Sequence, residues 1–181
     1  MDQPSLPAAA RAELAPGGKL RAGMNLGNTL FTSKDAATGE LSGVSVDLMN
    51  ALAERLGVPV KLVIHATPGD VADASEQNTW DVAILAIEQA RAKTIAFSPA
   101  MTEIEATYVV RKDSPLKSAA EVDADGIRIA VSDKAGYELF LTRTLRHAEL
   151  VKTKGLQGGI AVFKTGSTHA LAGLRPALLE C

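Results

Sequence analysis

The chain has 181 residues, of which 46% are hydrophobic and 22% charged, and this composition is typical of a globular protein. Its formal net charge of −2 excludes a basic surface of the kind that binds nucleic acid, and every apolar run falls short of the roughly 18 residues that span a membrane. The single cysteine, Cys181, excludes an internal disulfide framework and a cysteine-based metal site.

Residues 1–18 lack the basic and apolar regions of a signal peptide, so we interpret them as an N-terminal leader. Two alternatives stand for this leader. "AAARAEL" forms a helical turn or two before Pro16 and Gly17, or the segment has no fixed structure.

Beyond residue 18, short β-like runs alternate with helical periodicity. Ser45 or Asp47 is expected to cap the first helix and Gly57 to end it, and Ser118 with Glu121 matches a capping box. Residues 30–43 are rich in turn formers and predict a small hairpin or loop. The predicted strands are residues 19–26, 60–64, 81–87, 105–112, 127–131, 148–153 and 169–173, and the predicted helices are residues 45–57, 68–77, 89–97, 136–147 and 156–164.

This alternation predicts the α/β class, with parallel sheets covered by helices. The pattern indicates two such units, with residues 105–115 as a crossing segment between them. We therefore predict a leader at residues 1–18, lobe 1 at residues 19–108 and lobe 2 at residues 109–181. In open parallel sheets, ligands bind beyond the carboxyl ends of strands. This rule points to the residues that follow "LRAGM", "VAILA" and "RIAV".

Five stretches, in this order, carry a resemblance to a known family: "LRAGMN", "TGELSGVSVDLMNALAERLGVPVKLV", "WDVAILAIEQARAKTIAFSPAM", "TYVVRKDSPLKSAAEVDADGIRIAV" and "HALAG". The chain resembles the family 3 periplasmic solute-binding proteins, which deliver polar amino acids to ABC transporters. The resemblance implies a type II periplasmic-binding-protein-like fold of two α/β lobes joined by a hinge. It also implies that a small carboxylated, amino-acid-like solute binds in the interlobe cleft, with no chemistry, no cofactor and no metal.

Arg91 is the central candidate residue. In the family, an arginine after the lobe 1 strand forms a two-pronged pair with the ligand carboxylate, and Arg91 matches its position before "IAFSPAM". A guanidinium presents a planar fork that suits a carboxylate. The alternative is a weak helix-surface pair with Glu88. The usual hydroxyl residues of this wall are replaced by "AILAI", so the main-chain groups of Ala86 and Ile87 are the remaining candidates there.

The resemblance also assigns residues elsewhere. Lys134, Ala135 and Gly136 match a turn at a helix start, where free N–H groups attract anions, although an ordinary strand-to-helix turn fits equally. Tyr137 lines the cleft or packs in the core. Asn25 and Asn28 follow the first strand as ligand candidates or as loop residues.

One departure from the family concerns the ligand's ammonium group. Leu174 stands where relatives often carry an aspartate, and Glu103 is the preferred substitute. The predicted ligand-binding set is therefore Arg91, Asn25, Asn28, Ala86, Ile87, Glu103, Lys134, Ala135, Gly136 and Tyr137.

The resemblance sets three further expectations. Relatives continue beyond the position of Pro176, so we expect a C-terminally truncated chain with an incomplete second lobe, and self-association through an apolar face that the truncation exposes on lobe 1. We expect an ABC permease as partner and a periplasmic location, with a cytoplasmic one open because residues 1–18 do not match a signal peptide. His65, His147 and His169 have no metal-ligand spacing.

Two other functions stay open. Some relatives on this scaffold are cyclohexadienyl dehydratases, and an acid such as Glu103 or Glu138 would have to donate the proton. A cytosolic ligand-sensing module is the other alternative.

Overall fold

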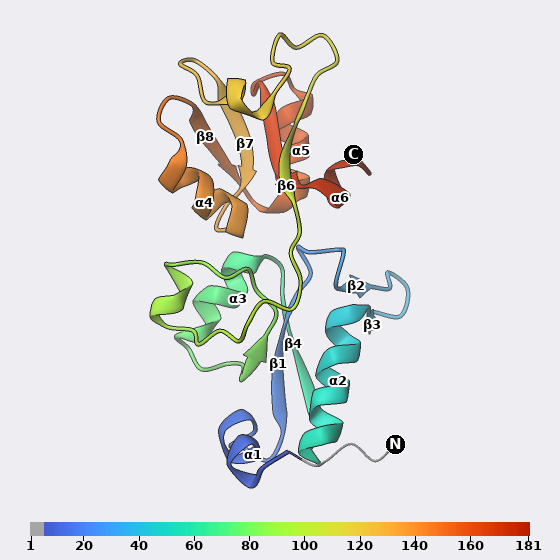
Figure 1. Cartoon of the computed structure of the whole chain (residues 1–181). Coiled ribbons are helices and arrows are strands. Elements are labelled where there is room, and N and C mark those ends of the chain that lie inside the picture. Colours follow the sequence, from blue (N-terminus) through green and yellow to red (C-terminus); the bar gives the residue numbers. More distant parts are fainter. Residues whose placement is uncertain (1–5) are drawn as a thin grey trace. The chain divides into compact units, whose positions relative to one another are not determined.

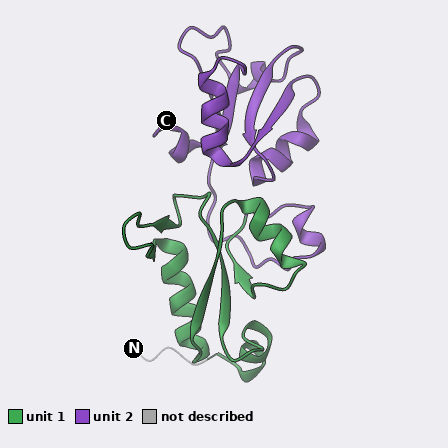
Figure 2. Ribbon diagram, turned by 180° about the vertical axis from the view of Figure 1, so that it is seen from behind, with its two compact units in different colours: residues 1–85 green, residues 86–181 purple. Residues whose placement is uncertain are grey.

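The computed structural model describes residues 6–181, and it has the predicted alternation of strands and helices (Figure 1). The chain divides into two compact units, residues 1–85 and residues 86–181 (Figure 2). The lobe boundary predicted from the sequence, between residues 108 and 109, stays a prediction. Residues 1–5 of the predicted leader lie outside the described residues.

Unit 1 is built on a three-stranded parallel sheet with the order β4-β1-β5. Strand β1 (Leu20–Asn25) pairs with β4 (Val60–His65) along its whole length, from Leu20 opposite Val60 to Asn25 opposite His65. Strand β5 (Val82–Ala83) pairs with β1 at two positions only. The predicted strand at residues 81–87 is therefore too long, because the chain leaves the sheet edge and Ala86 and Ile87 are exposed.

Two helices cover opposite faces of this sheet (Figure 1). Helix α2 (Val44–Leu56) packs Val46 and Met49 against Ala22 and Met24 of β1, and it ends at Gly57 in the left-handed conformation, as predicted. Its N-cap is Gly43, so Ser45 and Asp47 lie inside the helix and the predicted side-chain cap is wrong. Phe31 explains this: its carbonyl lies 2.6 Å from where a Cβ on residue 43 would be, at a φ of +106° that favours glycine.

Helix α3 (Pro68–Ser75) covers the other face. It begins with a capping box, in which the Asp70 N–H donates to the Thr67 hydroxyl (3.1 Å) and the Thr67 N–H donates to the Asp70 carboxylate (3.0 Å). The Trp80 indole N–H donates to the Val71 carbonyl (2.8 Å), which ties the residues before β5 to this helix.

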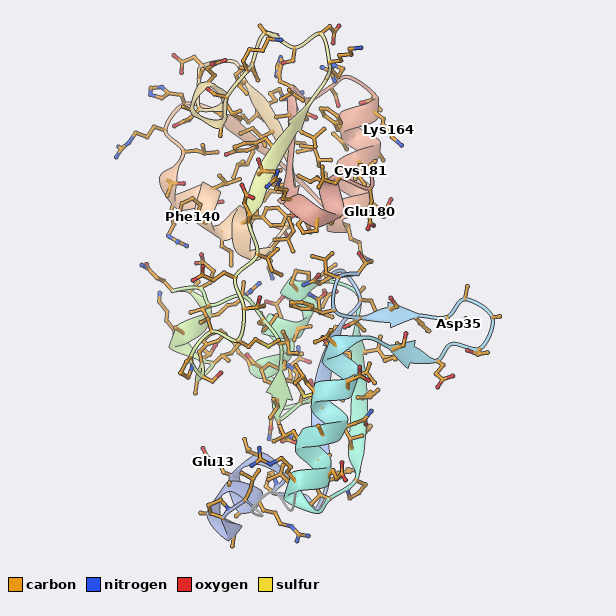
Figure 3. All side chains as sticks on the ribbon, turned by 45° about the vertical axis from the view of Figure 1, so that its right-hand side comes forward. Glu13, Asp35, Phe140, Lys164, Glu180 and Cys181 are labelled. Atoms are coloured by element: carbon orange, nitrogen blue, oxygen red, sulfur yellow. The ribbon has the colours of Figure 1, made fainter. Side chains whose placement is uncertain are left out.

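Two small elements complete unit 1. Helix α1 (Ala8–Leu14) corresponds to "AAARAEL", so the helical alternative for these residues is confirmed, and Leu14 and Ala15 pack against Leu20 and Leu56. Strands β2 (Ser33–Lys34) and β3 (Leu41–Ser42) form the small antiparallel hairpin, with Asp35 in its loop (Figure 3).

Unit 2 contains a mixed four-stranded sheet with the order β6-β9-β7-β8. Strand β6 (Ala106–Val110) is antiparallel to β9 (Ala170–Leu174), and β7 (Arg128–Ser132) is parallel to both β9 and β8 (Glu149–Thr153). The central strands are almost entirely buried, which explains their uninterrupted apolar sequence.

Helices cover both faces of this sheet as well. Helix α4 (Gly136–Thr144) packs on one face, whereas α5 (Gly155–Lys164) and α6 (Arg175–Leu178) pack on the other. The predicted helix at residues 89–97 is only a single 3-10 turn, η1 (Arg91–Lys93).

The capping box predicted at residues 118–121 is wrong: Ser118 precedes a short 3-10 turn, η2 (Ala119–Val122), and its side chain makes no capping hydrogen bond. There the Glu121 carboxylate accepts from the Lys117 N–H (2.8 Å) and from the Ser118 hydroxyl (3.0 Å). Among residues 6–181, the helices are all too short or too polar to cross a membrane.

Candidate functional site

Arg91 is a buried cation at the beginning of η1. It is 5% exposed, so it is not a solvated surface charge. Its Nη1 donates to the carbonyl of Ala86 (3.1 Å), and its Nη2 donates to the carbonyl of Lys134 (2.7 Å). The short segment after β5 and the turn after β7, distant in sequence, therefore meet at one guanidinium.

The turn after β7 places Lys134, Ala135 and Gly136 between the strand and α4. Lys134 has a φ of +55°, in the left-handed region that residues with a Cβ seldom adopt. The Ala135 N–H closes the turn by donating to the Ser132 carbonyl (3.1 Å). Gly136, the first residue of α4, lies so near Ala86 that a Cβ at position 136 would be 2.6 Å from the Ala86 Cβ. Glycine is needed here for a close approach, not for its φ.

Glu138 also belongs to this region, although the sequence pointed to it only as a candidate acid for a dehydratase reaction and not as one of the ligand-binding residues. It is fully buried, and its carboxylate accepts from the Lys134 N–H (3.0 Å) and the Thr142 hydroxyl (2.6 Å), and pairs with Lys152 Nζ (2.9 Å). The hydrogen bond with Glu138 raises the pKa of Lys152. An acid in the first turn of a helix was the available signal, but such acids are common there.

Glu88, the alternative surface partner of Arg91, is itself buried and forms an ion pair with Arg143 of α4. The predicted alternative of an exposed helix-surface pair is therefore wrong on both counts: neither side chain is exposed, and η1 is a single 3-10 turn. Glu88 is a second residue of the segment after β5 that contacts α4.

Three other predicted residues of unit 2 differ in their burial. Tyr137 packs against the core cluster beneath α4, and burial raises the pKa of its phenol. Of the two alternatives predicted for Tyr137, these contacts match packing in the core. Ile87 is 54% exposed, and the Glu103 side chain is exposed. Their roles toward a ligand stay predictions.

Asn25 and Asn28 belong to unit 1. The Asn25 side-chain oxygen accepts from the Gly27 N–H (2.9 Å), the arrangement of an asparagine that shapes a loop. The Asn28 side-chain oxygen is buried and has no hydrogen-bond partner among the residues that the structure describes. Across this described part of the chain, no group of three or more histidine, cysteine, aspartate or glutamate residues could hold a metal ion.

The fold is that of an α/β protein of the periplasmic-binding-protein-like class, with two units that each contain a sheet between helices. The sequence profile of the bacterial extracellular solute-binding proteins, family 3, matches residues 20–180. The chain therefore belongs to this family, and its general role is solute binding.

Solved structures agree with this assignment. The chain is similar to an ancestral amino acid-binding protein, AncCDT-1, described as a precursor of cyclohexadienyl dehydratase, at 26% identity and a TM-score of 0.75, covering 92% of this chain and 74% of that one. It is also similar to an ancestral arginine-binding protein bound to arginine, at 25% identity and a TM-score of 0.74, covering 90% and 73% of the two chains. A putative binding component of an ABC transporter from Wolinella succinogenes, complexed with lysine, shares the fold at 22% identity and a TM-score of 0.72, covering 86% and 68%.

Proposed function

We propose that this protein binds a small amino-acid-like solute and that Arg91 holds the carboxylate of that solute. The observation that carries the proposal is the buried guanidinium, whose two Nη groups donate to the main-chain carbonyls of Ala86 and Lys134. A carboxylate is a stronger acceptor than a neutral carbonyl and matches the planar fork with two parallel hydrogen bonds. In this proposal, the Nη groups of Arg91 give up a hydrogen bond to a main-chain carbonyl and donate to the solute carboxylate instead.

This exchange also suggests a place for the ammonium group of an amino acid. A carboxylate that takes Nη2 releases the Lys134 carbonyl, which then needs another donor. An α-ammonium group carries three donors and can supply one. In this proposal a main-chain carbonyl contributes what relatives obtain from an aspartate at the position of Leu174.

The class of solute is supported by the relatives. The family is one of solute-binding proteins, and two solved relatives at 25% and 26% identity are described as amino acid-binding and arginine-bound. We propose an amino acid, with a cationic side chain as the first to test. We also propose, from the family alone, a periplasmic location and an ABC permease as partner. Self-association stays a prediction.

A dehydratase-like reaction has weaker support. Its candidate acids are Glu103, which is exposed, and Glu138, whose carboxylate is occupied by Lys134, Thr142 and Lys152. The likeness to a precursor of cyclohexadienyl dehydratase keeps the test worthwhile. Incubation with prephenate or arogenate, followed by aromatic absorbance, would reveal such an activity.

The test of the binding function is isothermal titration calorimetry with L-arginine, L-lysine and the remaining amino acids, beside the decarboxylated analogues agmatine and cadaverine. We expect an amino acid to bind and its decarboxylated analogue to fail. Arg91→Ala should weaken binding by about 2–5 kcal/mol. Arg175→Ala is the matched control, because Arg175 forms an exposed ion pair with Glu105 in the same unit. Equal affinity in wild type and Arg91→Ala, or equal binding of an amino acid and its decarboxylated analogue, would refute the proposal.

A further inference from the structure

We infer that Glu138 is a positioning residue: held by Lys152, it fixes the left-handed turn at Lys134 and thereby the carbonyl that faces Arg91. The inference rests on the proposed function for its effect on solute binding. Its structural part, the control of the turn by Glu138, can be measured without any ligand.

The contacts of Glu138 run from the α4 interior to the turn. Its side chain is fully buried, and one carboxylate oxygen accepts from the main-chain N–H of Lys134 at 3.0 Å. The other oxygen accepts from the Thr142 hydroxyl at 2.6 Å and lies 2.9 Å from Lys152 Nζ. A buried carboxylate with three donors is satisfied and has little freedom to move.

The turn needs such an anchor. Lys134 carries a Cβ, yet its φ is +55°, a conformation that persists only when the surrounding structure imposes it. Its N–H is bound by Glu138 and its carbonyl by Arg91. The N–H and the carbonyl of this one strained residue are therefore both fixed, the N–H by Glu138 and the carbonyl by Arg91, which we propose binds the solute carboxylate.

Lys152 orients the acid. It lies on β8 directly opposite Val131 of β7, one residue before the strand ends at Ser132. Its ammonium group pairs with Glu138 and, more distantly, with Asp133 at 3.7 Å. The edge of the sheet thus supplies the cation that keeps the Glu138 carboxylate directed at the turn.

If Glu138 is removed, a positioning role and a purely electrostatic role predict opposite changes in the affinity for the solute. Removing an anion near Arg91 should strengthen the binding of a carboxylate if charge alone matters. Removing the acceptor that fixes Lys134 should weaken binding, because the turn relaxes and the Lys134 carbonyl, the proposed acceptor of the solute's ammonium group, loses its fixed position.

The experiment compares Glu138→Met with Glu121→Met. Glu121 is a matched control, since it also accepts the N–H of the residue four positions earlier, Lys117, at 2.8 Å. Amide hydrogen exchange by NMR should show at least tenfold faster exchange at Lys134 in Glu138→Met, with Lys117 unchanged, and the reverse in Glu121→Met. Calorimetry with L-arginine should show at least tenfold weaker binding for Glu138→Met and wild-type affinity for Glu121→Met.

Two further variants keep the test informative if Glu138→Met does not fold or if it lowers affinity for another reason. Glu138→Gln keeps an oxygen acceptor for the Lys134 N–H, so we expect L-arginine affinity within threefold of wild type. In a Lys134→Gly background, where a left-handed φ has no steric cost, Glu138→Met should weaken binding less than it does in the wild-type background.

Each outcome decides a different claim. Unchanged exchange at Lys134 in Glu138→Met, or tighter binding of L-arginine by that variant, overturns the positioning role. If Glu138→Met does not fold, an L-arginine affinity of Glu138→Gln that differs from wild type by more than threefold overturns it instead. A wild-type protein that binds no L-arginine counts against the proposed function for this solute only, since the exchange rates still decide whether Glu138 fixes the turn.

Discussion

The carboxylate of Glu88 accepts a hydrogen bond from the guanidinium of Arg143, 55 residues further along the chain. Glu88 is almost fully buried, whereas the Arg143 side chain is 39% exposed and also lies over the ring of Phe140, at 5.9 Å from its centroid. Phe140 and Arg143 are both on α4, and Phe140 is itself exposed on that helix (Figure 3). This ion pair joins the segment after β5 to α4, in addition to the contact of Arg91 with Lys134 in the turn before that helix.

The ion pair predicts a measurable coupling. Glu88→Gln should lower the free energy of unfolding by about 1–3 kcal/mol, because it removes a charged acceptor from a buried position. Chemical denaturation of Glu88→Gln, Arg143→Met and the double variant gives the coupling energy. The double variant should lose less than the sum of the single losses. Strict additivity would show that the pair contributes nothing as a pair.

The close approach of Gly136 and Ala86 predicts a steric effect. Gly136→Ala would place two Cβ atoms 2.6 Å apart, which forces one of the two segments to shift. We expect a loss of about 1–3 kcal/mol in stability, the usual cost of overpacking. Adding Ala86→Gly removes the opposing methyl group and should restore most of this loss. The control is Gly17→Ala, since a Cβ at Gly17 meets nothing within 4 Å. No recovery in the double variant would show that the clash lies elsewhere.

Arg21 of β1 forms an ion pair with Asp81, whose carboxylate accepts from the Arg21 main-chain N–H (2.8 Å) and side-chain Nε (3.1 Å). This pair predicts that the stability of the fold depends on acid pH. Burial is the largest influence on Asp81 and raises its pKa, but the hydrogen bonds and charge of Arg21 together outweigh it and hold the pKa below the usual 3.8. A carboxyl group with a depressed folded-state pKa stabilises the fold above its unfolded-state pKa, and this stability is lost as the pH falls through the folded-state value. Asp81→Asn should therefore cost about 2–3 kcal/mol at pH 7 and progressively less below pH 4.

Denaturant unfolding of wild type and Asp81→Asn between pH 2 and pH 7 measures this difference. Asp125→Asn serves as the control, since the Asp125 carboxyl group is 93% exposed. A stability gap for Asp81→Asn that stays constant across this pH range would contradict the assignment of the gap to the ionised pair.

The capping box of α3 predicts a small loss of stability when its hydroxyl group is removed. Thr67→Ala removes the acceptor of the Asp70 N–H and should lower the unfolding free energy by about 1 kcal/mol. Thr67→Ser keeps the hydroxyl group and should stay close to wild type. Thermal unfolding followed by circular dichroism compares the two. If Thr67→Ser were destabilised as much as Thr67→Ala, the lost methyl group rather than the hydrogen bond would be responsible.

Local patterns predicted most of the secondary structure. A run rich in β-branched residues marked β4 and Gly57 marked the end of α2, since these signals depend on neighbours within a few residues. The cap of α2 was misassigned because the carbonyl of Phe31, distant from the helix start in sequence, decides which residue fits there. The strand after Asp81 was drawn too long because apolar content does not say where a strand loses its pairing partner.

For the candidate site, the sequence by itself determined the residue types: a family-matched arginine after a strand, and a small-residue turn before a helix. Only the tertiary structure decided their partners, namely that Arg91 donates to Lys134, that Gly136 meets Ala86, and that Glu88 pairs with Arg143. The physical reason is the separation of the interacting residues along the sequence. Helix and strand signals come from residues a few positions apart, whereas each of these contacts joins segments more than 40 residues apart and depends on which buried polar groups must satisfy one another once the chain has folded.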